Sequence, residues 1–386
     1  MVTDRDLSQL PGPVLFDATA VPSDRGGVGR YVDGIVPALT AKGVELIVVA
    51  QPRDREVFER AGARVVDAPP LASSTPGRFL WEQVALPRLA RRLRVRLVHS
   101  PHYTFPIVMG RRRIVTVHDL TFYSHPQLHG MAKRLFFRAW LRLGALLRQP
   151  VVAVSEATGR EYRDRFRRRG EVTVAPLGYE ESLFHPPSPE ESSAFRRHAA
   201  QQERDWVAFL GTLEPRKNVV ALIEAYERAV TALPAAERPS LLLAGAAGWD
   251  PHVGPAVEKA AARGFDVRLL GYLPVELLAP FLGDAEVVAY PSLGEGFGLP
   301  VLEAMASGGV VLTSDRLSLP EVGGDAVAYT GTSAGEIAVV LSELLRDGSR
   351  RSELRSRARQ RALSFSWPRT AERHLVAYRA AIGHAR

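Results

Sequence analysis

The sequence predicts an α/β protein built on two doubly wound, Rossmann-like parallel sheets. Apolar, β-branched runs alternate with helical patterns along most of the 386 residues, which is typical of parallel sheets covered by helices. The alternation stops once, in a polar segment over 177–205 whose PPSP stretch (186–189) indicates part of a linker. We therefore expect an N-terminal domain over 1–185, a second domain over 186–365 that faces it across a cleft, and a C-terminal helix over 366–386 that packs back on the first domain.

The expected strands are runs of apolar and β-branched residues bounded by turn signals. They fall at 13–19, 44–50, 96–100, 113–119, 150–155 and 172–176 in the first half, and at 206–211, 240–245, 266–271, 285–290 and 310–314 in the second. The helices are expected near 28–42, 77–93, 130–147, 156–168, 219–230, 335–348, 350–363 and 367–383. Ligands bind beyond the carboxyl ends of the strands in such sheets, so the residues that follow each strand are the candidates for a site.

The composition is that of a globular protein with a positively charged first half. The formal net charge is +8, and residues 1–185 hold 28 Lys and Arg against 18 Asp and Glu, a surplus of +10. Such a field favours anionic partners such as nucleic acid, phosphorylated substrates or acidic membranes. There is no cysteine, no signal-peptide layout at the start, and no apolar run near the roughly 20 residues of a membrane helix. We expect a cytoplasmic protein, with peripheral contact at the inner face of an anionic membrane as a further expectation.

The stretch Gly294–Ser314, GEGFGLPVLEAMASGGVVLTS, places two glutamates in a run that is otherwise almost uncharged. Gly298 suits a loop with unusual backbone angles, and Pro300 suits the first turn of a helix. Glu295 is therefore expected in a loop and Glu303 about one turn into a short helix, whose free N–H groups attract an anion such as phosphate. The less favoured alternative is that Glu303 merely lies on an exposed helix face.

The stretch GTLEPRKN (211–218) follows an expected strand and precedes an expected helix. Arg216 and Lys217 lie in its loop, within reach of a phosphate bound there. The alternative is a pair of solvated surface cations, but cations are electrostatically unfavourable at the start of a helix. The phosphate hypothesis is therefore favoured.

Two further stretches follow strands of the first half. In SDRGGVGRY (23–31), three glycines, Gly27 among them, permit a close approach of the backbone to a ligand. The pattern is not the dinucleotide fingerprint GxGxxG, and a plain glycine turn is an equal alternative. In TVHDLTF (116–122), His118 and Asp119 lie where an expected strand ends, and a structural and a catalytic His118 are equally favoured.

The helix expected over 131–148 carries Arg134, Arg138 and Arg142 on one face and apolar residues on the rest. A membrane-surface helix fits this pattern. A core helix with a solvated stripe of arginines is the favoured interpretation.

The remaining charged runs and motif searches give no further candidate site. The basic runs 111–113 and 165–169 are expected to be solvated edges that add to the positive field. HExxH, GxSxG and the P-loop pattern are absent. The only Asp-x-Asp, Asp4-Arg5-Asp6, has no strand before it, so no metal-holding carboxylate pair is expected there.

Taken together, these stretches resemble one family, the retaining GT-B glycosyltransferases of family 4, also called group 1. The resemblance runs along most of the chain, and its most specific mark is the pair of glutamates within EGFGLPVLE. The matching stretches are GGVGRY (26–31), HD (118–119), VSE (154–156), GTLEPRKN (211–218), AG-x-x-GW (244–249), LGYLP (270–274) and YPSLGEGFGLPVLEAMASG (290–308).

The resemblance implies roles for the matched residues of the glutamate stretch. Glu295 is expected to contact the hydroxyls of the donor sugar near the reacting carbon, and Glu303 to hold the nucleotide ribose. The backbone N–H groups of Phe297, Gly298 and Leu299 are expected to bind sugar and diphosphate. These roles suit the chemistry of sugar transfer, because a carboxylate stabilises an oxocarbenium-like transition state and a helix N-terminus stabilises a diphosphate leaving group.

The resemblance also implies roles outside that stretch. Arg216 and Lys217 are expected to neutralise the diphosphate without a metal. Gly27 is expected to approach the phosphates from the first domain, and His118 to lie by the donor sugar. Many relatives carry an arginine where this chain has Thr212 in the donor loop, which places more of the phosphate charge on Arg216 and Lys217.

The implied activity is retaining, metal-independent transfer of a sugar from a nucleotide-diphosphate donor to an acceptor. Mannose from GDP-mannose is the first expectation for the donor, and no cofactor is expected. The acceptor stays open among a lipid-linked glycan, a polysaccharide end and a small molecule. The alternatives are a nucleotide-sugar epimerase or hydrolase on the same fold, a non-catalytic nucleotide-sugar sensor, and nucleic-acid binding through charge alone, without specificity.

Overall fold

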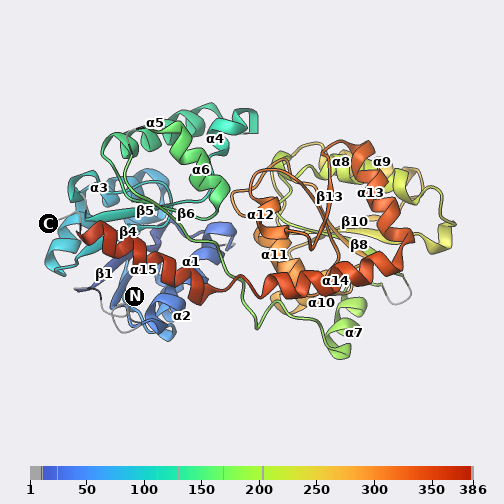
Figure 1. The fold of residues 1–386 in the computed structure, drawn as a ribbon, viewed down its shortest axis with the longest axis horizontal. Helices are drawn as coiled ribbons and strands as arrows, with labels where there is room; N and C mark the ends of the chain where they lie inside the picture. Colours follow the sequence, from blue (N-terminus) through green and yellow to red (C-terminus); the bar gives the residue numbers. More distant parts are fainter. Residues whose placement is uncertain are drawn as a thin grey trace. The chain divides into compact units, whose positions relative to one another are not determined.

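The computed structural model describes residues 10, 12–23, 25–110, 112–128, 130–167, 169–201 and 204–383. The chain divides into two compact units (Figure 1): unit 1 contains the residues up to 178 and those from 365 onward, and unit 2 contains residues 179–364. Each unit has its own parallel sheet, so the predicted fold class is confirmed. The Asp4-Arg5-Asp6 stretch lies outside the described residues, as do Arg111 and Arg168 of the basic runs.

Unit 1 is built on a parallel sheet whose seven described strands lie in the order β3-β2-β1-β4-β5-β6-β7. The strands are β1 (Val14–Asp17), β2 (Leu46–Ala50), β3 (Arg64–Asp67), β4 (Leu97–Ser100), β5 (Arg113–Val117), β6 (Val151–Ala153) and β7 (Val172–Val174). The sequence did not predict β3, because this edge strand offers only the pair Val65–Val66 between two exposed charged residues. The other six strands match the apolar runs to within a few residues.

Helices from both ends of the chain cover the sheet of unit 1. They are α1 (Gly27–Ala41), α2 (Arg55–Arg60), α3 (Thr75–Arg92), α4 (Thr121–Ser124), α5 (Met131–Leu146), α6 (Glu156–Arg165) and α15 (Trp367–Gly383). The last of these, α15, packs against α1 and against strands β4 to β7 (Figure 1). Only glycine fits at Gly34 of α1, because a Cβ there would lie 2.0 Å from the ring of Trp367.

A buried polar network joins α15 to the sheet of unit 1. The hydroxyl of Tyr378 lies 2.6 Å from Nδ1 of His99, and Nε2 of His99 lies 2.8 Å from the hydroxyl of Thr116. The hydroxyl of Tyr31 lies 2.9 Å from Thr116 and 2.8 Å from Nε2 of His374. Since buried polar groups must be paired, these bonds specify how α15 sits on the sheet.

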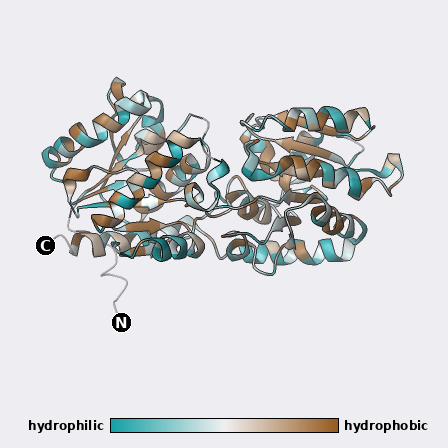
Figure 2. Cartoon of the chain, turned by 90° about the horizontal axis from the view of Figure 1, so that it is seen from above, coloured by the Kyte–Doolittle hydropathy of each residue, from teal (hydrophilic) through white to brown (hydrophobic). Residues whose placement is uncertain are grey.

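Unit 2 is built on a second parallel sheet, whose six described strands lie in the order β10-β9-β8-β11-β12-β13. The strands are β8 (Trp206–Leu210), β9 (Ser240–Ala244), β10 (Val267–Gly271), β11 (Val287–Tyr290), β12 (Val311–Ser314) and β13 (Ala328–Thr330). The helices are α7 (Pro189–His198), α8 (Val219–Val230), α9 (Val253–Ala262), α10 (Leu278–Gly283), α11 (Leu299–Ala306), α12 (Leu319–Gly323), α13 (Ala334–Arg346) and α14 (Gly348–Ala362). In Figure 2 strands are largely apolar and helices carry both colours, as expected when helices sandwich a buried sheet.

The segment interpreted as a linker contains a helix. Ser188 accepts a hydrogen bond from the backbone N–H of Glu191, whose carboxylate accepts one from the N–H of Ser188, and this capping box starts α7. The ring of Phe195 is buried, with its centroid 4.9 Å from that of Trp206 in β8. The interpretation of PPSP as linker is therefore wrong from Ser188 onward, because one buried aromatic in a polar stretch gives little periodic signal.

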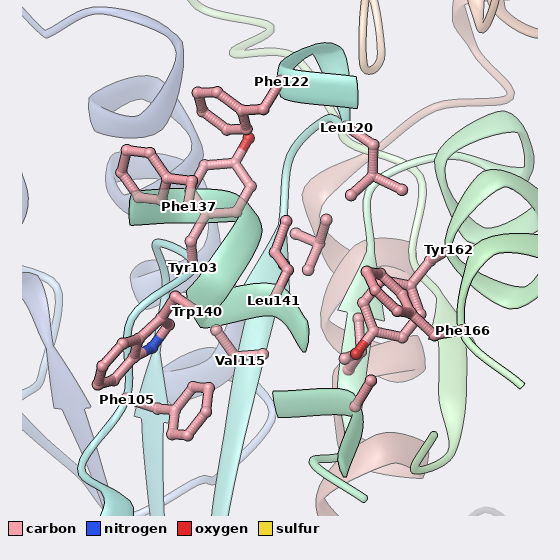
Figure 3. Close-up of a cluster of buried hydrophobic side chains, with 13 residues drawn as sticks. Tyr103, Phe105, Val115, Leu120, Phe122, Phe137, Trp140, Leu141, Tyr162 and Phe166 are labelled. Atoms are coloured by element: carbon pink, nitrogen blue, oxygen red, sulfur yellow. The ribbon is translucent and has the colours of Figure 1, made fainter. Parts of the chain in front are cut away.

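Helix α5 differs from its expected form. Phe137, Trp140 and Leu141 face the buried aromatic cluster of unit 1 (Figure 3), as a core helix should. The arginine stripe, however, is not simply solvated: Arg138 is partly buried and donates to the carbonyl of Phe122 over 2.7 Å. No helix in the described part of the chain has the length and apolar character needed to cross a membrane.

Candidate active site

The candidate site lies where the strand order of unit 2 reverses. From β8 the chain proceeds outward through β9 and β10, and then returns to β11 on the other side of β8. Val287 and Val288 of β11 pair with Val207 and Ala208 of β8, so the loops that follow these two strands are neighbours. Such a switch point is where open parallel sheets bind ligands. The two loops contain GTLEPRKN and GEGFG, the stretches singled out in the sequence.

Backbone and side-chain bonds tie the two loops together. Asn218, in the left-handed region with φ 60°, donates to the carbonyls of Pro291 and Thr332 over 3.2 and 2.8 Å. The N–H of Leu293 donates to the carbonyl of Arg216 over 2.8 Å. The loops therefore form one body, and Thr212 lies half-buried near its start, directly after Gly211.

Glu295 is the centre of a buried charge cluster. Its Oε1 accepts hydrogen bonds from Nζ of Lys217 at 2.8 Å, from the Tyr290 hydroxyl at 3.0 Å and from the Ser292 hydroxyl at 2.7 Å. Its Oε2 forms an ion pair with Arg216. Glu295 and Lys217 are each only 7% exposed, so these are buried ion pairs. The fold thus brings the predicted Arg216 and Lys217 to the predicted Glu295, which lies 78 positions beyond Lys217 in the sequence.

The charges of the cluster set its protonation. Burial raises the pKa of the Glu295 carboxyl, but Arg216 and Lys217 outweigh burial and hold that pKa well below its usual range. At Arg216 burial lowers the pKa, but Glu295 and Glu214 outweigh it and raise the pKa of the guanidinium. At Lys217 burial prevails and lowers the pKa of the ammonium group. Glu295 is therefore ionised at neutral pH and pairs with both cations, and Arg216 forms a second ion pair with Glu214.

The second glutamate lies on α11, directly after the loop. Gly298, at φ 105°, precedes α11, and a Cβ there would lie 2.9 Å from the side chain of Leu319. Phe297 and Leu299 flank it and are buried. Glu303 is only 2% exposed, so the alternative that it lies on an exposed helix face is wrong.

Several residues of the site were missed in the sequence. Tyr290 and Ser292 both donate to Glu295, and Ser318 donates to the carbonyls of Glu295 and Phe297, over 2.8 Å in each case. Tyr290 and Ser292 stand at the carboxyl end of a predicted strand, which was an available signal. Ser318 comes from the loop after β12, and nothing local in the sequence marks it.

Two predicted site residues belong to unit 1. Gly27 begins α1, and a Cβ there would meet no atom of the described residues within 4 Å, so packing does not explain the glycine. Beside it, Arg25 is held at φ 48° with ion pairs of 3.3 Å to Asp33 and 2.9 Å to Asp54. The glycine loop is thus anchored from one side.

His118 follows β5 and is held in one tautomer. Its Nε2 donates to the carbonyl of Pro101 over 2.7 Å, and its ring lies edge-on to Tyr31 with centroids 5.1 Å apart. Burial lowers the pKa of His118, against the opposing effects of the Pro101 bond and Asp119. The imidazole is therefore neutral at neutral pH, with Nδ1 as a hydrogen-bond acceptor.

Comparison with known proteins agrees with this geometry. Residues 25–183 match the family model described as Glycosyltransferase Family 4, and residues 190–361 match the one described as Glycosyl transferases group 1. The chain belongs to the family 4, group 1 glycosyltransferases. It is therefore an enzyme that transfers a sugar, and the resemblance seen in its motifs is confirmed.

One relative and one solved structure match nearly the whole glycosyltransferase, and a second relative matches about half of it. It is 27% identical to the O-antigen chain mannosyltransferase B of Escherichia coli, over 95% of this chain and 99% of that protein. It is 32% identical to the MMP alpha-(1->4)-mannosyltransferase of Mycolicibacterium hassiacum, over 55% of this chain and 49% of that protein. The structure of Anabaena HepE with UDP and glucose matches with a TM-score of 0.72 and 18% identity, over 95% and 98% of the two chains. The GT-B fold predicted for the glycosyltransferase is thereby confirmed.

Proposed function

We propose that this glycosyltransferase binds a nucleotide-diphosphate sugar in unit 2, at the switch point between β8 and β11. The observation that carries the proposal is the cluster of Arg216 and Lys217 around the buried Glu295, directly before the N-terminus of α11. Two fixed cations and a helix N-terminus suit a diphosphate, and fixed donors stabilise the charge that develops as it leaves. These groups supply the charge without a metal, so chelation with EDTA should leave turnover unchanged.

The remaining contacts follow from the same placement. Glu303, buried on α11, holds the ribose hydroxyls, and the backbone N–H groups of Phe297, Gly298 and Leu299 bind the phosphates and the sugar. Two carboxylate oxygens accept from two vicinal hydroxyls, which is the geometry that a ribose presents. Glu303→Gln should therefore weaken binding of the nucleotide diphosphate, which calorimetry measures.

We further propose that the anomeric configuration is retained through attack on the donor's leaving-group face. The carboxylate of Glu295 accepts bonds from four side chains and has a depressed pKa, so it is a poor nucleophile. In the step, the bond from the anomeric carbon to the diphosphate oxygen breaks while the acceptor oxygen bonds to that carbon on the same face. The acceptor proton passes to the departing phosphate oxygen. NMR of the product reports the configuration, and an inverted linkage would exclude this route.

Residues of unit 1 complete the proposal. Neutral His118 offers Nδ1 as an acceptor to a sugar hydroxyl, and Gly27 leaves room for the backbone of α1 to approach a phosphate. His118→Ala should lower turnover more than donor affinity. The acceptor is a glycan, a lipid-linked glycan or a small molecule with a free hydroxyl.

The donor we propose first is GDP-mannose. Both relatives described above carry the name mannosyltransferase, and one of them matches over 95% of this chain. A thermal-shift screen against UDP-, GDP-, ADP- and dTDP-sugars tests the donor before any acceptor is known, since a ligand of the folded state raises its melting temperature. A rise in melting temperature with GDP-mannose supports this donor, and a rise with another sugar nucleotide replaces it. An unchanged melting temperature with every sugar nucleotide contradicts the donor site.

The rival activities are separated by one further incubation. With donor but no acceptor, a transferase leaves the sugar nucleotide almost intact, a hydrolase releases free sugar and an epimerase changes the sugar. Turnover with any acceptor of a glycan panel excludes a non-catalytic sensor.

A further inference from the structure

The loop that follows β4, residues 101–105, holds the side chain of His118. Strands β4 and β5 are neighbours in the sheet of unit 1, with Ser100 paired to Val115, so the loops after them lie side by side. The carbonyl of Pro101 accepts the 2.7 Å hydrogen bond from Nε2 of His118. A carbonyl can only accept, so this bond keeps the proton on Nε2 and leaves Nδ1 as the acceptor. The position of the 101–105 loop therefore decides what His118 offers to a ligand.

The 101–105 loop has a strained turn at its centre. Tyr103 has φ 45°, in the left-handed region that residues with a side chain rarely adopt. Its ring packs in the buried aromatic cluster of unit 1 (Figure 3). Its hydroxyl accepts a hydrogen bond from the N–H of Asp119 over 3.1 Å, and its own N–H donates to the carbonyl of Thr116 over 3.3 Å. Such a turn persists only where its surroundings hold it.

Two adjacent residues of α3 anchor the 101–105 loop beside this turn. Glu82 is only 3% exposed, and its Oε2 accepts a hydrogen bond from the hydroxyl of Thr104 over 2.6 Å. Gln83 donates from Nε2 to Oε1 of Glu82 and to the carbonyl of Phe105, over 2.9 Å in each case. The loop is thus tied to α3 at two successive residues, directly after the strained Tyr103.

The carboxyl of Glu82 acts in this anchor as a neutral hydrogen-bonding group. Burial raises the pKa of Glu82 to about 8, with a smaller contribution from Asp17. The groups that lower this pKa are Thr104, Arg78 and Gln83. Glu82 is therefore mostly protonated at neutral pH. An apolar side chain would fill the same space without the cost of burying a polar group, so the hydrogen bond to Thr104 is what the carboxyl adds.

We propose that Glu82 is a positioning residue of the glycosyltransferase, which acts through Thr104 and the 101–105 loop to hold His118 with Nδ1 as an acceptor for the donor sugar. Glu82 itself touches neither sugar nor diphosphate. Without the anchor, the strained turn relaxes, the carbonyl of Pro101 moves away from Nε2, and the imidazole is free to turn. The inference rests on the proposed function for the role of His118 in transfer, whereas the effect of the anchor on the imidazole does not.

NMR of the histidine rings in the full-length protein tests the anchor without a substrate. The ring signals of His118 are those that His118→Gln removes, and in the wild type its proton should be on Nε2 and exchange slowly with water. Thr104→Val and Glu82→Leu should each make this proton exchange at least about tenfold faster, because its hydrogen bond opens more often. Glu82→Gln keeps an oxygen that accepts from Thr104, and it should restore slow exchange.

The matched control for Thr104→Val is Thr40→Val on α1. Thr40 is also a half-buried threonine of unit 1, and its hydroxyl donates to the carbonyl of Pro37 over 2.9 Å. This variant should keep the wild-type exchange of the His118 ring proton, which separates release of the loop from a general loss of stability. Wild-type exchange in both Thr104→Val and Glu82→Leu overturns the proposal. So does equally fast exchange in Thr40→Val.

Turnover distinguishes failure of the anchor from failure of the proposed function. Thr104→Val should lower turnover by at least about tenfold, since a misplaced group loses much of its effect. Its thermal shift with the donor should equal that of the wild type. In the His118→Ala background Thr104→Val should lower turnover no further, because both changes act on one imidazole, and a further tenfold loss overturns the positioning role. Unchanged turnover in His118→Ala alone overturns the proposed role of His118 and with it the effect of Glu82 on transfer, whatever the exchange of the ring proton.

Discussion

Arg216 and Lys217 share one carboxylate, and this sharing decides which substitutions of the site are informative. Removing Glu295 leaves buried Lys217 without its carboxylate while Arg216 keeps Glu214, and loss of one partner of a buried ion pair destabilises a protein by about 3–5 kcal/mol. Removing Lys217 leaves Glu295 paired with Arg216. Lys217 is therefore the better probe of catalysis, and Glu295 the better probe of stability.

Lys217→Met should lower turnover by at least about tenfold, because a charge that stabilises the leaving diphosphate is lost while the aliphatic stem is kept. Initial rates at saturating donor measure the effect. Lys259→Met, on the exposed surface of α9, is the matched control and should leave turnover unchanged. Equal rates for the two variants would remove Lys217 from the proposed mechanism.

Glu295→Gln should make stability less dependent on pH in the acid range. The pKa of Glu295 is lowered from 4.5 in the folded state, so its ionised form stabilises the fold fully above pH 4.5 and progressively less below it. The difference in unfolding free energy between wild type and variant should therefore be largest near neutral pH and shrink as the pH falls below 4.5. Urea unfolding at a series of pH values measures it, and a constant difference would contradict the buried ion pairs.

The sequence anticipated the charged residues of the site better than the uncharged ones. The charged residues of the site stand in loops that follow parallel strands, which is where such sheets bind ligands. They are Arg216, Lys217 and Glu295. A tyrosine or serine at the end of a strand is also expected for packing or for a turn. Only the fold therefore shows that Tyr290 and Ser292 donate hydrogen bonds to Glu295. Their roles toward a donor stay predictions.

At the scale of elements, the crossing of α1 and α15 depends on one glycine. Alanine usually favours a helix over glycine by about 1 kcal/mol. At Gly34 the added methyl group would overlap the ring of Trp367, so Gly34→Ala should instead lower the melting temperature. Gly254→Ala on α9 is the control, since a Cβ there meets no described atom within 4 Å. Thermal unfolding compares them, and a stabilised Gly34→Ala protein would contradict the packing of α15 on α1.

The stability of unit 1 should depend on the hydroxyl groups of the buried polar network beneath α15. Tyr378→Phe removes the partner of Nδ1 of His99, a buried group, and should destabilise unit 1 by about 1–3 kcal/mol. Hydrogen exchange of the α15 amides should rise in this variant, while that of α11 in unit 2 stays as in the wild type. Similar exchange in α15 of both proteins would show that the network does not hold the helix.

Helices and strands with a clear periodic pattern of apolar residues were predicted well, and those with a weak pattern were not. The apolar pattern of α8 was placed over 219–230, as observed. The strands β3 and β13 were missed because each has only three or four residues, and the helix α7 was missed because Phe195 is its only buried side chain. Their formation depends on the neighbours they pair with, which local sequence does not contain.

At the scale of the whole molecule, the alternation of strands and helices was enough to predict two parallel α/β sheets, and the resemblance of the motifs to a known family implied the GT-B fold. The sequence placed the C-terminal helix on the first domain only as an expectation, and the structure shows α15 packed on α1 within unit 1. Which residues make that contact was beyond prediction, since Gly34 and Trp367 are separated by more than three hundred positions.

Because α15 belongs to unit 1, the order of protein synthesis does not follow the order of the units. Residues 179–364 form one uninterrupted unit and can close as soon as they have left the ribosome. Unit 1 begins first, yet the α1 face that receives Trp367 stays uncovered until α15 has also emerged. A nascent chain halted before α15 should therefore carry a protease-resistant unit 2 behind an N-terminal part that chaperones and proteases still recognise.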